Sequence, residues 1–344
     1  WLFAICVGAL VGGLLQFLIQ LPLVWRLSST LRVSLSTRVP GVRDALTAFG
    51  PAVAGRGVVQ ISLYLDNILA SLLAVGAVGA IANAAVLINL PLGVFGMAVA
   101  IAELPELSRA DPTKARRAIA DRIARAVRQS AFLVCPSVVG YLAFGWLIVG
   151  LFFRGGQFDL ASQWLVWVVL AGYSLGLLAS TSTRILQNAF FALRDTRTPA
   201  WIASARLVAS ASVGYLLMTR FDRWAVADLV PAVERPDLYF GAVGLALGSS
   251  VGAWAELGLL AWALRRRLPE LRLPVVVIAG RLALAVGVAL PALALWWALA
   301  DASLLVGAAV VLPSYAVAYL GIAAWRGFPE IEMWVGKVAR RIGR

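Results

Sequence analysis

The sequence predicts an all-α polytopic membrane protein with nine transmembrane helices. Hydrophobic residues make up 61% of the 344 positions, charged residues make up 14%, and the mean hydropathy is +0.88, which together exceed the apolar character of soluble domains. Nine stretches are long and apolar enough to cross a hydrocarbon core about 30 Å thick. Because backbone polar groups in lipid must bond internally, these stretches are helices. They cover residues 2–24, 45–71, 79–103, 130–152, 161–191, 200–219, 240–264, 275–299 and 303–325.

The basic residues alternate between successive connections. Every second connection is rich in Lys and Arg. These basic connections hold 22 Lys and Arg in total, and they are the loops 25–43, 104–129, 192–199 and 265–274 and the tail after 325. The connections between them hold four. By the positive-inside rule the first set is cytoplasmic, so the first helix runs from outside to inside and the C-terminus is cytoplasmic. The net charge of +13 therefore reflects topology and does not indicate a nucleic-acid partner.

Composition also excludes several classes of site. The chain has no histidine, which removes Ser-His and Cys-His triads and histidine metal sites. Cys6 and Cys135 both fall within predicted spans, and neither has the sequence spacing of a metal ligand. We expect both cysteines to be small core residues. No phosphate-binding glycine loop is present, so we expect no enzyme, no cofactor and no metal. Trp1 opens an apolar segment without the basic start of a signal peptide, and we expect an N-terminal truncation.

The second span carries two ionisable residues. Arg56 lies about eleven residues inside it, hence about 16 Å deep, too far for easy snorkelling to the headgroups. It either lines the transport pathway or belongs to a buried ion pair. Asp66 either holds a cation near the outer face or marks a polar helix end.

Two basic segments have helical amphipathic patterns. Residues 113–128 follow the N-cap pair Asp111-Pro112, and residues 330–342 repeat the pattern near the C-terminus. Such helices lie in the headgroup plane and favour anionic lipids, or else they are solvated connectors. Two stripes of small residues, which favour close packing of helices within the chain, are Gly172 with Gly176, and Gly244 with Gly248 and Gly252.

Arg184 and Arg206 flank the short cytoplasmic turn 193–199 and reach similar depth, about 10–14 Å. No acid on this hairpin shares their depth. Two unpaired guanidinium groups at one level suit a diphosphate, although both side chains can instead snorkel to cytoplasmic headgroups. Glu256 and Arg281 also match in depth, across the 265–274 turn, and their opposite signs predict a structural ion pair.

Several motifs, taken in order, resemble the MurJ (MviN) family of lipid II flippases. The most specific runs Leu90-Pro91-Leu92-Gly93-Val94-Phe95-Gly96, continues at Ala98, and ends with Leu104-Pro105 and Leu107-Ser108-Arg109. The others are Gly12-Gly13-Leu14-Leu15-Gln16-Phe17 with Gln20-Leu21-Pro22, Gly50-Pro51-Ala52 with Gln60-Ile61-Ser62, and Phe190-Phe191-Ala192-Leu193-Arg194-Asp195-Thr196-Arg197-Thr198-Pro199. The nine spans then correspond to family helices six to fourteen.

The resemblance implies part of a two-lobed MATE-like exporter fold around a cationic cavity. It assigns residues 1–24 to the last helix of the N-terminal lobe, 25–44 to a basic cytoplasmic loop, 45–264 to a C-terminal lobe of six transmembrane helices, 275–325 to a terminal pair forming a lipid groove, and 326–344 to a basic amphipathic cytoplasmic tail.

One helix departs from the family pattern. Ala85, Val86 and Asn89 are uncharged where the family usually carries an acid, an arginine and another acid. We therefore take Asn89 as a pathway residue, with Arg56, Arg184 and Arg206 as candidate substitutes for the missing charges. Arg184 stands where the family often has Lys or Arg.

The resemblance implies a transporter that flips lipid II, a polyprenyl-diphosphate-linked peptidoglycan precursor, across the bacterial inner membrane. Lipid II and anionic membrane lipids are then the expected partners, together with cell-wall synthesis proteins. The alternatives are an exporter of another lipid-linked oligosaccharide or of a drug, and a non-transporting membrane scaffold for wall synthesis that recruits partners through its basic helices.

Overall fold

The computed structural model describes residues 2–27, 64–93 except Val75, 116–230 except Gln157, 237–299 and 303–331. Within these ranges the regular structure is entirely helical. The chain divides into two compact units, residues 1–48 and 49–344, which are described separately.

The first unit contains one described element, helix α1, Leu2–Leu27. It is long and apolar enough to cross a membrane, as predicted for residues 2–24, and nearly all of its side chains are exposed.

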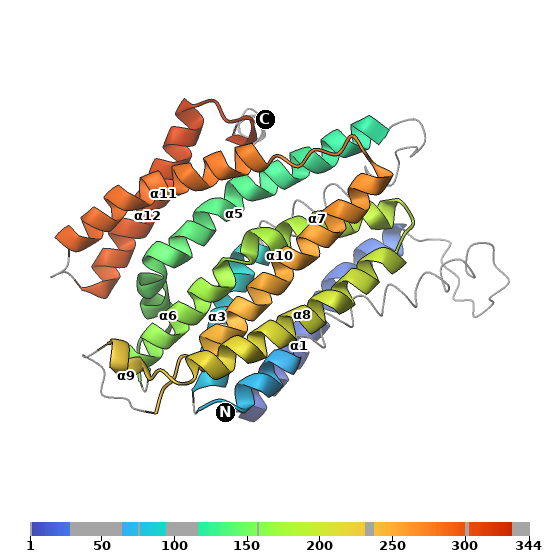
Figure 1. Ribbon diagram of the computed structural model, residues 1–344. Helices are drawn as coiled ribbons and strands as arrows, with labels where there is room; N and C mark the ends of the chain where they lie inside the picture. The colour runs from blue at the N-terminus through green and yellow to red at the C-terminus, as the bar shows by residue number, and fades with distance from the viewer. Residues whose placement is uncertain are drawn as a thin grey trace. The chain divides into compact units, whose positions relative to one another are not determined.

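The second unit is a bundle of long helices that lie side by side (Figure 1). Residues 64–71 are also helical. The remaining elements are α3 Ala77–Pro91, α5 Arg116–Phe153, α6 Leu160–Ser174, α7 Leu177–Ala192, α8 Arg197–Phe221, α9 Val226–Leu229, α10 Gly241–Arg267, α11 Val275–Ala298 and α12 Leu304–Trp325.

The predicted spans agree with the described helices in most places. Six of the described helices are long and apolar enough to cross a membrane, and the bent pair α6–α7 makes a seventh when it is taken as one span. That pair replaces the single helix predicted over 161–191. The spans predicted over 45–71 and 79–103 fall partly outside the described residues, so the full count of nine stays a prediction.

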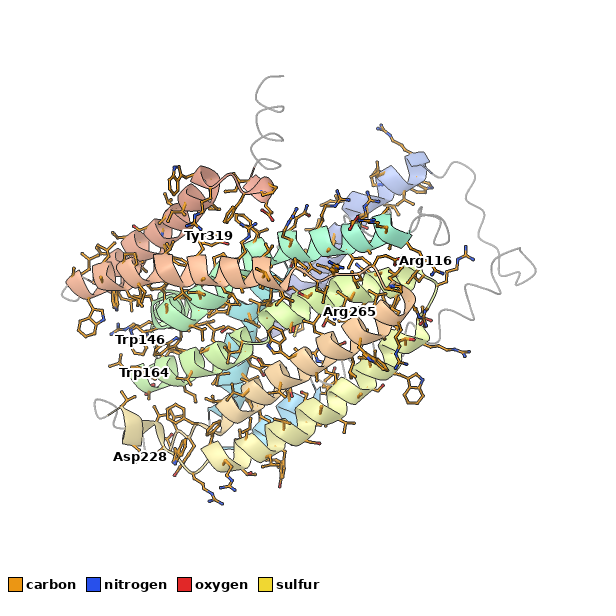
Figure 2. The ribbon with its side chains drawn as sticks, turned by 45° about the horizontal axis from the view of Figure 1, so that its top comes forward. Arg116, Trp146, Trp164, Asp228, Arg265 and Tyr319 are labelled. Carbon is orange, nitrogen blue, oxygen red and sulfur yellow. The ribbon has the colours of Figure 1, made fainter. Side chains whose placement is uncertain are left out.

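Helices α5 and α10 hold the bundle together. Helix α10 packs against α8, α7, α6 and α3, while α5 packs against α6, α7, α11 and α12. Figure 2 places Arg116 and Arg265 at one end of the bundle and Trp146, Trp164 and Asp228 at the other. The arginine-rich ends of α5 and α10 therefore share a side, in keeping with the charge alternation of the loops.

Glycines bring α8 and α10 into backbone contact. A methyl group at Gly248 would overlap the backbone of Gly214, and one at Gly244 would overlap the backbone at Met218. The predicted role of this stripe in intramolecular packing is confirmed. Helix association in lipid depends on such close van der Waals contact, because lipid tails are as apolar as the helices.

Side chains of α10 form hydrogen bonds to the backbone at the break between α6 and α7. The two helices meet at a 40° bend, which leaves carbonyls near the break without helical partners. The Ser250 hydroxyl donates to the Gly172 carbonyl at 2.6 Å, and the Trp254 indole donates to the Leu175 carbonyl at 2.9 Å. A bent span is tolerated at membrane depth only when neighbouring side chains satisfy its backbone in this way.

Two prolines free carbonyls that tyrosines then satisfy. Pro136 cannot donate to the Phe132 carbonyl one turn earlier, and the Tyr319 hydroxyl of α12 donates to that oxygen at 2.9 Å. Pro91 likewise frees the Leu87 carbonyl, which accepts from Tyr141 of α5 at 2.6 Å. These bonds tie α12 and α3 to α5.

The amphipathic helix expected over 113–128 is not a separate element. From Arg116 it continues without a break into the membrane span as α5, because no glycine or proline interrupts residues 116–135. Its apolar face, including Ile119 and Ile123, is buried against α7 and α10, so the headgroup-plane orientation is wrong. Most of the predicted helix over 330–342 lies outside the described residues.

We predict that Gly248→Ala lowers the unfolding free energy by about 1–3 kcal/mol, because the added methyl forces the α8 and α10 backbones apart. Unfolding of the purified protein in mixed detergent micelles measures this. Gly258→Ala on the same helix is the control, since nothing lies within 4 Å of the added methyl. Equal stability of the two variants would contradict the packing account.

Candidate functional site

The structure brings Arg184, Arg206 and Glu256 together from three helices. Arg184 lies eight residues before the end of α7 at Ala192, hence about 12 Å from it. Arg206 lies nine residues after the start of α8 at Arg197, about 14 Å away, and Glu256 lies eleven residues before the end of α10, about 16 Å away. The two arginines therefore lie at similar distances from the turn that joins α7 to α8, as predicted.

Glu256 is the centre of the cluster. Its Oε2 accepts from Arg206 Nη1 at 2.7 Å, and its Oε1 accepts from Gln187 Nε2 of α7 at 2.9 Å. The Glu256 side chain is 1% exposed, and that of Arg206 is 25% exposed. Both carboxylate oxygens therefore have partners, and the charge is buried in a hydrogen-bonded ion pair.

Two predictions about these residues are wrong. Arg184 and Arg206 are not both unpaired, because Arg206 is bound to Glu256, and Glu256 pairs with Arg206 and not with the expected Arg281. Matching depths across a short turn indicate partners only between helices that are consecutive in the sequence. The glycine stripe instead lays α8 directly on α10, which puts Arg206 beside Gly252, one turn before Glu256.

Arg184 has no ion-pair partner among the described residues. It is half-buried, and it lies within electrostatic reach of Arg206 and Glu256. Across the described part of the chain, no acid lies within ion-pair distance of its guanidinium. Arg184, Arg206 and Glu256 together carry one net positive charge.

Asp66 lies nearer to this cluster than its position in the sequence indicated. It is half-buried, and Arg206 and Tyr173 lie within its electrostatic reach, although the described residues include no direct ion pair to it. A bound cation at Asp66 stays a prediction. No three acidic or cysteine side chains gather into a metal site within the described ranges.

Asn89 is the one other predicted pathway residue that the structure describes, and it does not contact the cluster. Asn89 is exposed on α3, and its side chain makes no hydrogen bond to the cluster. Arg56 lies outside the described residues. The sequence analysis missed Gln187, although it follows Arg184 by three positions and so shares its helix face.

Arg281 belongs to a second buried cluster. Its Nη2 donates to Glu330 at 2.9 Å, Arg128 Nε lies 3.1 Å from the same carboxylate, and the Phe328 ring lies 3.5 Å from the guanidinium carbon. Gly327 adopts a positive φ of 63° just after α12, and Glu330, three residues further on, binds Arg281 of α11. The cluster thus fastens α12 to α5 and α11, and Glu330 is the partner that the sequence analysis did not find.

Asp195 stabilises the turn between α7 and α8. Asp195 Oδ1 accepts from the backbone amides of Arg197 and Thr198, which caps α8, and Arg267 pairs with Oδ2. Burial raises the pKa of Asp195, but the bonds from Thr198, the Arg267 charge and the Arg197 amide outweigh it, and its pKa falls below the ordinary value. The carboxylate therefore keeps its charge and holds the hairpin in shape.

The Arg184–Arg206–Glu256 cluster is suited to binding an anion. Guanidinium groups remain charged at any physiological pH and match the geometry of phosphate oxygens. The cluster includes no nucleophile and no free general base, which favours binding over bond chemistry.

Comparisons with known proteins agree on one family. The model of the family described as lipid II flippase MurJ matches residues 2–230. The chain is 28% identical over 256 residues to the probable lipid II flippase MurJ of Vibrio cholerae, a match covering 74% of this chain and 45% of that protein. It is 30% identical over 269 residues to the lipid II flippase MurJ of Burkholderia cenocepacia, covering 77% and 48%. The chain therefore spans about half the length of these relatives.

The fold has a solved counterpart. A structure of lipid II flippase MurJ in an inward closed conformation matches with a TM-score of 0.62 at 17% identity. The match covers 87% of this chain and 58% of that one. At this identity the likeness extends to the fold alone.

We predict that Glu330→Gln lowers the unfolding free energy by about 3–5 kcal/mol, because it leaves the 5% exposed Arg281 without a counter-charge. Thermal unfolding in detergent tests this, with the exposed Glu270→Gln as the matched control. The fastening role fails if the two variants unfold at the same temperature.

Proposed function

The chain belongs to the MurJ family of lipid II flippases, and on that basis we propose that its protein flips lipid II, a polyprenyl-diphosphate-linked peptidoglycan precursor, across the bacterial inner membrane for cell-wall synthesis. Flipping moves the headgroup without making or breaking a covalent bond. An ion gradient or the membrane potential supplies the driving force.

One observation supports this proposal above the others. Arg184 and Arg206 carry guanidinium groups at similar depth within the helices, with a single acid in direct contact. A charge inside a span is costly, about 2.5–3.5 kcal/mol on insertion scales, and such residues usually mark a substrate pathway. A diphosphate offers several anionic oxygens to such a pair.

Helix α3 lacks the charged residues that the family usually carries, and this is consistent with anion binding at Arg184 and Arg206. Val86 stands where the family carries an arginine, and its side chain is 58% exposed. Because α3 therefore presents an apolar surface at that point, we assign the anion-binding role to Arg184 and Arg206. Arg56 is a further pathway candidate outside the described residues.

The proposed function also assigns a membrane orientation and a role to each part of the chain. We place the C-terminus and the arginine-rich ends of α5 and α10 on the cytoplasmic side, where anionic lipids are their partners. Residues 45–264 then form most of the C-terminal lobe, and 275–325 form the lipid groove. A pure scaffold fits less well, because the apolar face of its expected recruiting helix is buried against α7 and α10.

We predict that Arg184→Gln and Arg206→Gln each reduce lipid II exposure on the outer face at least about tenfold, because each removes a charge-assisted bond worth about 1.5–3 kcal/mol. The test expresses the gene encoding this chain in bacteria depleted of their own lipid II flippase and measures externally accessible lipid II. The control is Arg220→Gln, an exposed arginine at the end of α8.

Two results would contradict the proposal. Failure of the unaltered gene to restore exposure, despite normal membrane levels, would exclude lipid II as the substrate. Rescue of an oligosaccharide-export or drug-export defect in its place would favour another transported molecule.

A further inference from the structure

We infer that Glu256 is a built-in counter-anion, which shares Arg206 with the transported diphosphate and thereby limits how tightly the site holds it. This inference rests on the proposed function, and it adds the residue that tunes the strength of anion binding.

The geometry leaves Arg206 able to bind a second anion. Only its Nη1 donates to Glu256, at 2.7 Å, and within the described residues its other nitrogens make no hydrogen bond. A quarter of the Arg206 side chain is exposed, whereas Glu256 is 1% exposed. An anion therefore approaches Arg206 from its exposed side while the carboxylate stays on the buried side.

Gln187 keeps the carboxylate in place. Its amide donates to Glu256 Oε1 at 2.9 Å, so the carboxylate is held from α7 and α8 together. Because it is anchored twice, Glu256 stays beside Arg206 when an anion arrives. Its negative charge then repels the phosphate oxygens across one shared guanidinium.

A transporter benefits from this repulsion. A passing ligand must bind well enough to enter the site and weakly enough to leave it. Two free arginines in a low-dielectric interior would hold a diphosphate strongly. With Glu256 in place, Arg206 is partly neutralised, and Arg184 has no direct partner in the part of the chain that the structure describes.

The inference predicts an order of anion affinities set by net charge. Arg184, Arg206 and Glu256 sum to +1 in the unaltered chain. Glu256→Gln raises the sum to +2, Arg206→Gln lowers it to zero, and the double variant Arg206→Gln/Glu256→Gln restores +1. Affinity for a diphosphate should be highest for Glu256→Gln, intermediate for the unaltered chain and the double variant, and lowest for Arg206→Gln.

Calorimetric titration of the purified chain in uncharged detergent tests this order, with inorganic pyrophosphate as the probe. We expect Glu256→Gln to bind pyrophosphate at least tenfold more tightly than the unaltered chain, and the double variant to bind within about threefold of it. Glu270→Gln, which neutralises an exposed acid beyond the end of α10, should leave the affinity unchanged. Weaker or unchanged binding by Glu256→Gln would overturn the inference.

A second comparison applies if Glu256→Gln does not fold. The double variant lacks both buried charges, and it must still bind pyrophosphate more tightly than Arg206→Gln. Equal or weaker binding would overturn the inference.

The failure of this inference differs from the failure of the proposed function. If the affinity order holds but the gene does not restore lipid II exposure, the counter-anion stands and the substrate assignment fails. If exposure is restored without the affinity order, the flippase stands and Glu256 has only a structural role.

Discussion

A helix inside a membrane finds no water for its polar groups, so each of them has to be satisfied by another part of the protein. The described helices meet this constraint at two of their internal prolines and at the break between α6 and α7. Tyrosines bind the carbonyls that Pro91 and Pro136 release, and α10 binds the carbonyls beside the α6–α7 break. These same bonds join α3 and α12 to α5, and they join α10 to α6 at the break, so the irregular positions contribute to holding neighbouring helices together.

Charged side chains inside the bundle also need partners, and leaving a charge unpaired costs more free energy than leaving a carbonyl unpaired. Arg281 is enclosed by Glu330 and Phe328, which makes it a structural fastening. Arg206 is only partly neutralised by Glu256, and Arg184 has no direct acidic partner among the described residues. The difference between the two clusters is one of exposure and charge balance. On the proposed function, this difference separates an arginine that holds the fold together from arginines that bind a ligand.

Much of the fold was predictable because apolar length and loop charge are local properties of the sequence. Six predicted spans match described helices, and the glycine stripes pack as expected. Partner choice was not predictable, because it depends on which helices pack together. Glu256 was assigned to Arg281 through a short turn, but the glycines of α10 place it against α8. The amphipathic pattern of residues 113–128 predicts a surface helix, but an apolar face with this spacing fits a lipid surface and a protein groove equally well.

If a diphosphate binds between Arg184 and Arg206 within the helix bundle, an experimental structure of the protein with a bound prenyl diphosphate will show it there. We expect phosphate density within hydrogen-bonding distance of the Arg184 guanidinium, with Glu256 still bound to Gln187 and to Arg206. Diphosphate density at another set of basic residues, with the Arg184 side chain extended toward the cytoplasmic headgroups, would contradict it.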